Sequence, residues 1–189
     1  TTCSASIMVM AKEQDDMQSG YEYDFSHDWP GIDVCAIGRD ATQKAVSMLG
    51  ARQVKTMRIP VVFDNACTAE MLEIIGDAFL GENIIKGKSY LKDKLGLSCF
   101  SPRINLIDNP LDSRAAEASG FDGEGVPSRN NTLVNNGAVT SFVYDSYWGR
   151  AAGKASTGNA VRSGYRTTPG LGLRHLCLLP GEDLTTSLK

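Results

Sequence analysis

Hydrophobic and polar positions alternate along two stretches near the start of the chain, Ser4 to Lys12 and Met17 to Phe25. A period of two residues is typical of half-buried strands. The polar residues Gln14, Asp15 and Asp16 between the two stretches are typical of a turn. The pattern predicts a β-hairpin.

The hydrophobic period then changes to that of a helix. From Val34 to Leu49 hydrophobic residues recur every three or four positions, Asp33 can cap the N-terminus, and Gly50 can end the helix. A second helix is predicted between Thr68 and Gly81, and a third helix or helix pair from Asn83 to Leu95.

Further strands are predicted by short runs of β-branched and hydrophobic residues. The pair Asn136-Gly137 lies between two of these runs and indicates a tight hairpin, because both residues tolerate positive φ. The glycine- and threonine-rich stretch from Lys154 to Gly172 is predicted to be a loop. The predicted strands are Val54 to Asp64, Arg103 to Asp108, Asn131 to Val134, Ala138 to Tyr144 and His175 to Leu179.

Together these elements predict an α+β fold, with helices packed on a mixed β-sheet followed by a largely antiparallel, β-rich half. Between Asp108 and Gly120 the composition shifts to Asn, Pro, Asp, Ser and Ala without periodicity, which indicates a loop. We therefore expect two parts, residues 1–108 and 109–189, while a single compact unit remains open.

Composition excludes several classes of protein. Apolar residues make up 42% of the 189 residues and charged residues 22%, as in ordinary globular domains. The net charge of -3, without a basic stripe, argues against a nucleic-acid partner. The longest apolar runs, such as Ile59 to Phe63, are far shorter than the ~20 residues of a membrane span.

Five widely spaced cysteines fit reduced thiols better than a disulfide framework. We therefore expect a soluble, cytoplasmic protein with no membrane partner. The chain has no initiator Met and enters a strand pattern directly, so it is expected to be a fragment of a longer protein.

Metal-binding motifs are weak in this sequence. The two histidines, His27 and His175, lie far apart, and neither has a second ligand-type residue at helical spacing. Cys177 lies two residues after His175, on the same predicted strand face, but the pair alone cannot complete a tetrahedral site. This pattern argues against a zinc site built within the chain.

Two polar segments could carry chemistry. In FDGEGVP, Asp122 and Glu124 lie in a glycine-flanked turn, where two carboxylates can bind a cation, act as acid and base, or bond nearby amides of a β-turn. Arg129 could pair with Glu124 or bind substrate. In STGNA, the side chains of Ser156, Thr157 and Asn159 can hold a peptide main chain or an anion.

The segment FDGEGVPSRNNTLVNNGAVTSFVYDSYWGRAAGKASTGNA resembles the C-terminal signature of the TldD/PmbA peptidase family, and RIPVVFD and INLIDNPL extend the resemblance upstream. In that family the active subunit carries an HExxxH zinc motif on the helix after the strand that RIPVVFD resembles. Here this helix reads EMLEIIGDAF, and the resemblance puts Glu73, Ile74 and Ala78 at the motif positions. The chain therefore resembles the PmbA/TldE branch, which lacks the zinc motif.

The resemblance implies a non-catalytic partner of a TldD-like catalytic subunit, in a cytoplasmic heterodimer that processes or degrades small unfolded peptides. A homodimer in isolation remains open. No cofactor or metal is expected in this chain, and zinc is expected in the partner. The family is also associated with modulation of DNA gyrase, and the acidic charge here gives no support for direct DNA binding.

The resemblance implies no catalytic residue in this chain. It implies contacts to substrate or to the partner subunit by six residues, Asp122, Glu124, Arg129, Ser156, Thr157 and Asn159. Two alternatives stay open. One is a stand-alone peptidase with an atypical metal site drawn from Glu73, Asp77, His175 and Cys177, and the other is a pure interaction scaffold.

Overall fold

The computed structural model describes residues 2–181, which form two compact units. The first ends at Val61 and the second begins at Val62. The division predicted after Asp108 stays a prediction.

The first unit begins with the predicted hairpin. β1 (Cys3–Glu13) pairs with antiparallel β2 (Asp16–Ser26) along its whole length, from Cys3↔Ser26 to Glu13↔Asp16. Gln14, at the turn, has a φ of 53°. A short 3-10 helix at Trp29–Gly31 follows. The prediction of two strands joined by a tight turn is confirmed.

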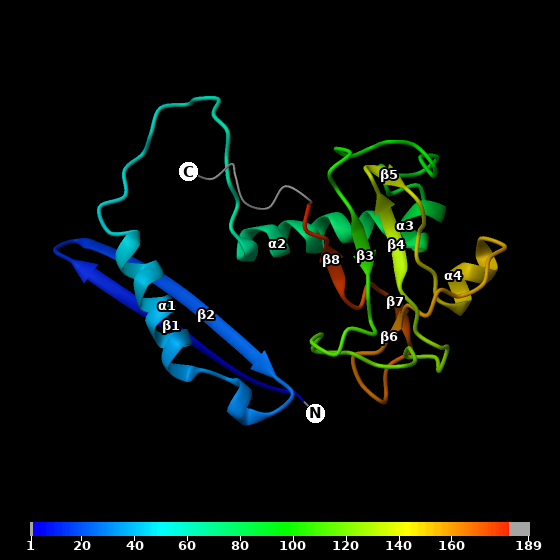
Figure 1. Cartoon of the computed structure of the whole chain (residues 1–189), viewed down its shortest axis with the longest axis horizontal. Coiled ribbons are helices and arrows are strands. Elements are labelled where there is room, and N and C mark those ends of the chain that lie inside the picture. The colour runs from blue at the N-terminus through cyan, green and yellow to red at the C-terminus, as the bar shows by residue number, and fades with distance from the viewer. Residues whose placement is uncertain (1, 182–189) are drawn as a thin grey trace. The chain divides into compact units, whose positions relative to one another are not determined.

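α1 (Val34–Ser47) packs on this hairpin, as Figure 1 shows. The side chain of Asp33 caps the helix, because it accepts a hydrogen bond from the Ala36 N–H at 2.9 Å. The helix face that meets the hairpin is buried through Ile37, Ala41 and Ala45. The helix is confirmed, although Met48, just beyond its last turn, is 50% exposed.

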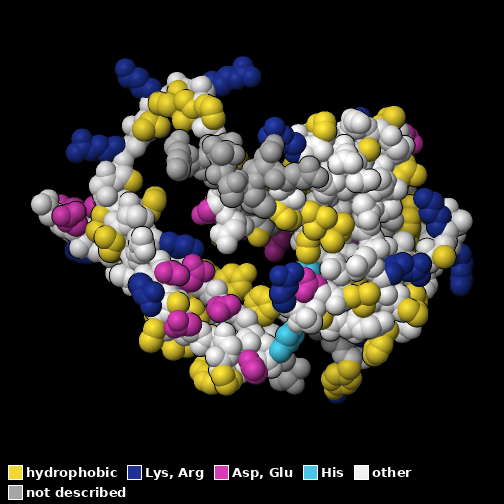
Figure 2. Space-filling model, in the orientation of Figure 1, with side chains coloured by type: hydrophobic (Ala, Val, Ile, Leu, Met, Phe, Trp, Pro, Cys, Tyr) yellow, Lys and Arg dark blue, Asp and Glu magenta, His cyan; other side chains and the backbone are white. Residues whose placement is uncertain are grey.

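The strand predicted from Val54 to Asp64 is wrong, because residues 51–64 contain no regular secondary structure. Most hydrophobic side chains of this segment are exposed beside Lys and Arg side chains, as Figure 2 shows. A strand needs a neighbour that accepts and donates its backbone hydrogen bonds. No described strand pairs with this segment, so hydrophobic alternation alone did not produce a strand.

The second unit begins with α2 (Asn65–Gly76), capped by the Asp64 carboxylate, which accepts from the Cys67 N–H at 2.7 Å. A 3-10 helix at Asp77–Phe79 and the short α3 (Gly81–Ile85) follow. The second predicted helix is therefore confirmed in its main part. The third is shorter than predicted, since turns replace it after Ile85.

A four-stranded sheet lies at the centre of this unit, in the order β5-β4-β3-β8 (Figure 1). The bounds of its strands are β3 Leu106–Asp108, β4 Asn131–Asn135, β5 Ala138–Val139 and β8 Leu176–Leu178. Asn136 and Gly137 join β4 to β5 with φ angles of 48° and 80°, which confirms the predicted hairpin turn. β5 ends five residues before the predicted Tyr144.

The combination of helices with β-sheets is confirmed, but the mixed sheet is not found in residues 2–181. Every ladder between the described strands is antiparallel. The parallel pairing between Leu80 and Val143 is an isolated bridge. The helices of the described residues therefore pack on antiparallel sheets, with α1 on β1 and β2, and α2 in contact with β8 of the four-stranded sheet.

One helix and one pair of strands were missed in the sequence. α4 (Ser146–Ala151) begins where the Asp145 carboxylate accepts from the Trp148 N–H at 2.7 Å. The predicted loop from Lys154 to Gly172 contains the small antiparallel pair β6 (Ala160–Val161) and β7 (Gly170–Leu171). Both are too short to give a hydrophobic period.

The hydrophobic core of the second unit lies between the sheet and the helices. Leu72 and Ile75 of α2 pack against it. Its fully buried side chains include Phe79, Leu91, Leu106, Leu133, Val134, Val139 and Val143. No helix in the described part of the chain is long and apolar enough to cross a membrane.

Candidate functional site

A cavity of about 480 Å³ lies in the second unit, between α2 and the segment that runs from β7 into β8. Half of its lining residues are aliphatic, and the others are glycines and residues with charged or titratable side chains. The lining residues are Ala69, Leu72, Glu73, Gly76, Asp77, Leu80, Leu171, Gly172, Leu173, Arg174, His175 and Leu176. A concave apolar site with a few polar groups is a usual form of a ligand-binding pocket.

The helix wall of the cavity is the segment in which the zinc motif is absent. Of the three positions assigned to HExxxH, only Glu73 lines the cavity. Ile74 is 79% exposed, and Ala78 is 8% exposed and packs in the core. A set of positions one residue earlier, Leu72, Glu73 and Asp77, keeps the same spacing, and all three of these residues line the cavity.

The donor set of this wall does not fit zinc in either placement. Leu72 has no donor atom, so at most two of the three positions, Glu73 and Asp77, offer carboxylates. Among residues 2–181, no group of three His, Cys, Asp or Glu side chains is arranged to hold a metal ion. No chemical step through a bound metal is therefore assigned to these residues.

His175 lines the opposite wall, whereas Cys177, two residues later on β8, does not line the cavity. The Cys177 thiol donates to the His175 carbonyl oxygen, with a sulfur to oxygen distance of 3.6 Å. Burial raises the pKa of this thiol, and the negative charges of Asp112 and Asp108 raise it further. The shift favours the neutral thiol, which is a poor ligand and nucleophile.

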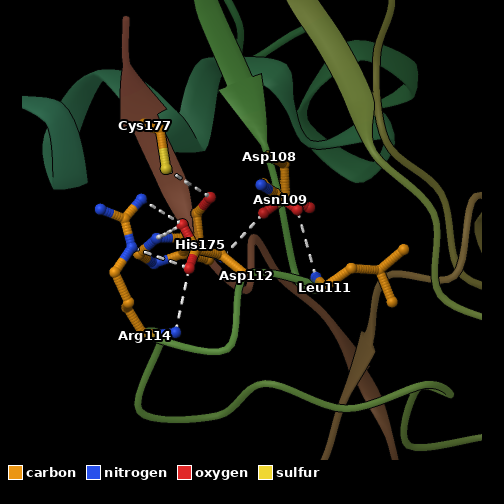
Figure 3. A network of polar contacts seen from close by, with 7 residues as sticks. All are labelled: Asp108, Asn109, Leu111, Asp112, Arg114, His175 and Cys177. Carbon is orange, nitrogen blue, oxygen red and sulfur yellow. Dashed lines mark hydrogen bonds and ion pairs between the residues drawn. The ribbon is translucent and has the colours of Figure 1, made fainter.

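The loop after β3 supplies a carboxylate beside His175, as Figure 3 shows. The Asp112 carboxylate accepts from Arg114 Nε at 3.0 Å and Nη2 at 2.7 Å, and one of its oxygens lies 4.0 Å from His175 Nε2. The hydrogen bonds from Arg114 hold the pKa of Asp112 well below its usual range. Asp112 therefore remains charged and paired.

The strand wall is held in place by the fully buried carboxylate of Asp108. One oxygen accepts from the backbone N–H groups of Arg174 at 3.0 Å and His175 at 2.8 Å. The other oxygen accepts from Asn159 Nδ2 at 2.6 Å. Asp108 thus links the cavity wall to the STGNA segment, a role that its position at a strand end did not reveal.

The hydroxyl and amide groups predicted in STGNA are used within the fold. Asn159 is fully buried, and its side-chain oxygen accepts from Asn131 Nδ2 at 3.0 Å and Thr157 Oγ1 at 2.7 Å. Thr157 Oγ1 also accepts from the Tyr144 N–H at 2.7 Å. Ser156 Oγ donates to the Tyr144 carbonyl oxygen at 3.2 Å.

The FDGEGVP segment packs against STGNA. Buried Asp122 accepts from the N–H groups of Glu124 and Val126 at 2.9 Å and of Ala160 at 3.0 Å, which is the β-turn alternative. Glu124 accepts from the Ser146 N–H at 2.9 Å, at the start of α4. Arg129 does not pair with Glu124.

Arg129 Nη2 donates to the Ser156 carbonyl oxygen at 3.2 Å. The structure therefore gathers all six predicted residues around STGNA, but none of them lines the cavity. Their role as substrate or interface contacts stays a prediction. Glu73, Asp77 and His175, three of the four residues of the alternative metal site, do line one cavity, whereas Cys177 does not. Within the described part of the chain, these three side chains are not arranged to make a zinc site.

The chain is similar to proteins of one peptidase family. Residues 56–188 match the PmbA/TldA metallopeptidase C-terminal domain, and residues 1–49 match the central domain of the same family. A metalloprotease PmbA homolog from Haemophilus influenzae is 27% identical over 83% of this chain and 35% of its own length.

Two solved structures share the fold with 26% identity and a TM-score of 0.83. One, from Thermotoga maritima, is described as a modulator of a DNA gyrase, and 95% of this chain matches 40% of it. The other is TldE from Thermococcus kodakarensis, with 96% and 41% covered. The chain thus spans between a third and a half of the length of these relatives.

Proposed function

Since the chain belongs to the PmbA/TldD metallopeptidase family, we propose that it forms part of a non-catalytic subunit of a TldD/TldE-type metalloprotease. The observation that carries this proposal is the helix wall of the cavity. Leu72, Glu73 and Asp77 face the cavity at the spacing of a zinc motif but do not offer its donors. A TldD-like partner would then supply the zinc and the hydrolytic step.

In this proposal the subunit holds a small unfolded peptide for processing or degradation in the cytoplasm. β8 supports strand addition as the binding mode, because it is an edge strand of the four-stranded sheet within the described residues. Leu176 of β8 also lines the cavity. A peptide paired with this edge would place alternate side chains toward the aliphatic lining.

The six residues around STGNA enter the proposal as contacts to the partner subunit or to the rim of its active site. Glu124 and Arg129 are the testable members, because they are the two exposed residues of the six. Substituting both should weaken assembly with the partner or peptide turnover. Unchanged assembly and turnover would remove these two residues from the contact surface.

The proposal treats the link to DNA gyrase as indirect. The net charge is -3, whereas proteins that bind DNA directly concentrate Lys and Arg on the contact surface. A gyrase-related role would then follow from turnover of a peptide or protein, rather than from DNA binding.

The experiment that tests the proposal is co-purification of the natural protein from its host, followed by metal analysis of each subunit. We expect zinc in the TldD-like subunit and no stoichiometric zinc in this one. Stoichiometric zinc in this subunit, removable by a chelator with loss of peptidase activity, would establish the stand-alone peptidase instead. A subunit that associates with the partner but leaves its cleavage unaltered would be a pure scaffold.

A further inference from the structure

The charged groups of the cavity differ between its two walls. On the strand wall, the Arg174 guanidinium donates to Ser128 Oγ at 2.6 Å and to the carbonyl oxygens of Glu117 at 3.0 Å and Phe121 at 3.3 Å. His175 lies beside the carboxylate of Asp112. Arg174 and His175 on this wall therefore already have polar partners.

On the helix wall, the two carboxylates have none. Glu73 and Asp77 are exposed at the cavity, and neither side chain has a hydrogen-bond or ion-pair partner among residues 2–181. They lie four residues apart at the end of α2, a spacing that puts two side chains on one helix face. The cavity thus combines aliphatic side chains with two carboxylates on the helix wall that are not paired with a cation among the described residues.

This combination selects for a ligand that is apolar with a cationic end. Resting on the peptide-holding function above, we propose that the cavity binds the ammonium group of a peptide between Glu73 and Asp77, with an adjacent apolar side chain against the aliphatic lining. An ammonium group has three donors and no acceptor, so it can bond to both carboxylates at once.

The space is sufficient for this ligand. About 480 Å³ falls within the range of small-ligand pockets and exceeds the volume of one side chain. Leu72, Leu80 and Leu173 supply apolar surface in the same cavity as the carboxylates. The ammonium group can come from a peptide N-terminus or from a lysine side chain, and the test separates these sources.

The test measures binding of three matched peptides to the full chain by isothermal titration calorimetry. The first is a short apolar peptide with a free N-terminus, the second is its N-acetylated form, and the third is acetylated but carries one lysine. All three have amidated C-termini. We expect the free-amine peptide, the lysine peptide or both to bind about tenfold more tightly than the uncharged one at low salt, and less so at high salt.

Two isosteric variants locate the effect. Glu73→Gln and Asp77→Asn should each weaken binding of the preferred cationic peptide roughly threefold, while binding of the acetylated apolar peptide stays unchanged. The unchanged binding also shows that the variants are folded. Glu70→Gln is the matched control, because Glu70 lies on α2 but does not line the cavity.

The outcomes distinguish this inference from the function on which it rests. Preference for the free amine alone assigns an N-terminal site, and equal preference for the lysine peptide assigns a general ammonium site. If all three peptides bind equally and neither variant matters, the ammonium site is wrong although peptide binding stands. If no peptide binds, both the site and the peptide-holding function are wrong.

Discussion

Asp108 connects the two segments of the second unit that the sequence could not relate to one another. Its carboxylate holds the backbone of Arg174 and His175 on one side and the Asn159 amide on the other. Because Asp108 and Asn159 are both fully buried, neither can exchange these partners for water. The geometry of the cavity wall therefore depends on a residue in STGNA.

Replacing Asn159 with alanine should destabilise the second unit. The change removes one donor from the buried Asp108 carboxylate and the acceptor of Asn131 Nδ2, which costs about 2 to 4 kcal/mol. Denaturant unfolding followed by tryptophan fluorescence measures the loss. Asn130→Ala is the control, because Asn130 is exposed and should tolerate the change; equal effects from both would contradict the network's role.

Gly20 should be intolerant of any side chain. A Cβ on Gly20 would lie 2.1 Å from the Ala41 carbonyl oxygen and 2.6 Å from the Ala45 N atom, so Gly20→Ala should force α1 away from β2 at a cost of roughly 2 kcal/mol. Hydrogen exchange of the hairpin amides measures this. Gly38 lies in α1, and a Cβ on it would meet nothing within 4 Å. Gly38→Ala should therefore stabilise the unit by about 0.5 to 1 kcal/mol.

Residue-level predictions from sequence succeeded where the partner is local. Asp33 caps the next helix, and Asp122 bonds the amides of its own turn, because both interactions span only a few residues. The partner of Glu124 is the Ser146 N–H rather than Arg129, and this bond spans 22 residues. Sequence gives no measure of such distant pairings.

At the scale of elements, the hairpin and α1 were predictable because each has a full hydrophobic period and its own stop signals. The segment from Val54 to Asp64 has the period of a strand, yet no described strand pairs with it. Short elements such as α4 and β6 carry too few residues for a period. An element was predicted correctly when it was long enough to show a hydrophobic period and, for a strand, when it had a partner strand; residue propensity alone did not decide the outcome.

The first unit should lose stability in acid. The Gly50 N–H and the Gln18 side chain bond to Asp16, and Lys44 bonds to Glu22, so the pKa of each carboxyl is lowered in the folded unit. Because folding lowers these two pKa values, the ionised carboxylates stabilise the folded unit fully at pH values above their usual pKa values of 3.8 and 4.5. This stabilisation is lost as the pH falls through the lower pKa values of the folded unit.

Denaturant unfolding across this pH range checks the expectation. Asp16→Asn and Glu22→Gln should each flatten the acid limb of the stability profile. Asp15→Asn, at the exposed neighbouring position, should leave the profile unchanged. An acid limb that survives both substitutions would show that other carboxyls are responsible.

At the scale of the whole molecule, the family was predictable and the site was predictable only in part. Glu73, Asp77 and His175 were named together as possible metal ligands, and all three line the cavity. The long C-terminal signature identified the family, and both domain matches confirm it. The cavity instead joins residues of α2 to residues about a hundred positions later. The six residues chosen from that signature lie around STGNA, whereas the cavity lies between α2 and the segment leading into β8.

Because the chain spans between a third and a half of its relatives, the central claim concerns the natural protein with its partner. The most direct test is cleavage of an unfolded peptide by the natural protein alone, by the TldD-like subunit alone, and by both together. The account predicts no cleavage by this protein alone and a changed rate when it joins the partner. Chelator-sensitive cleavage by this protein alone would contradict it.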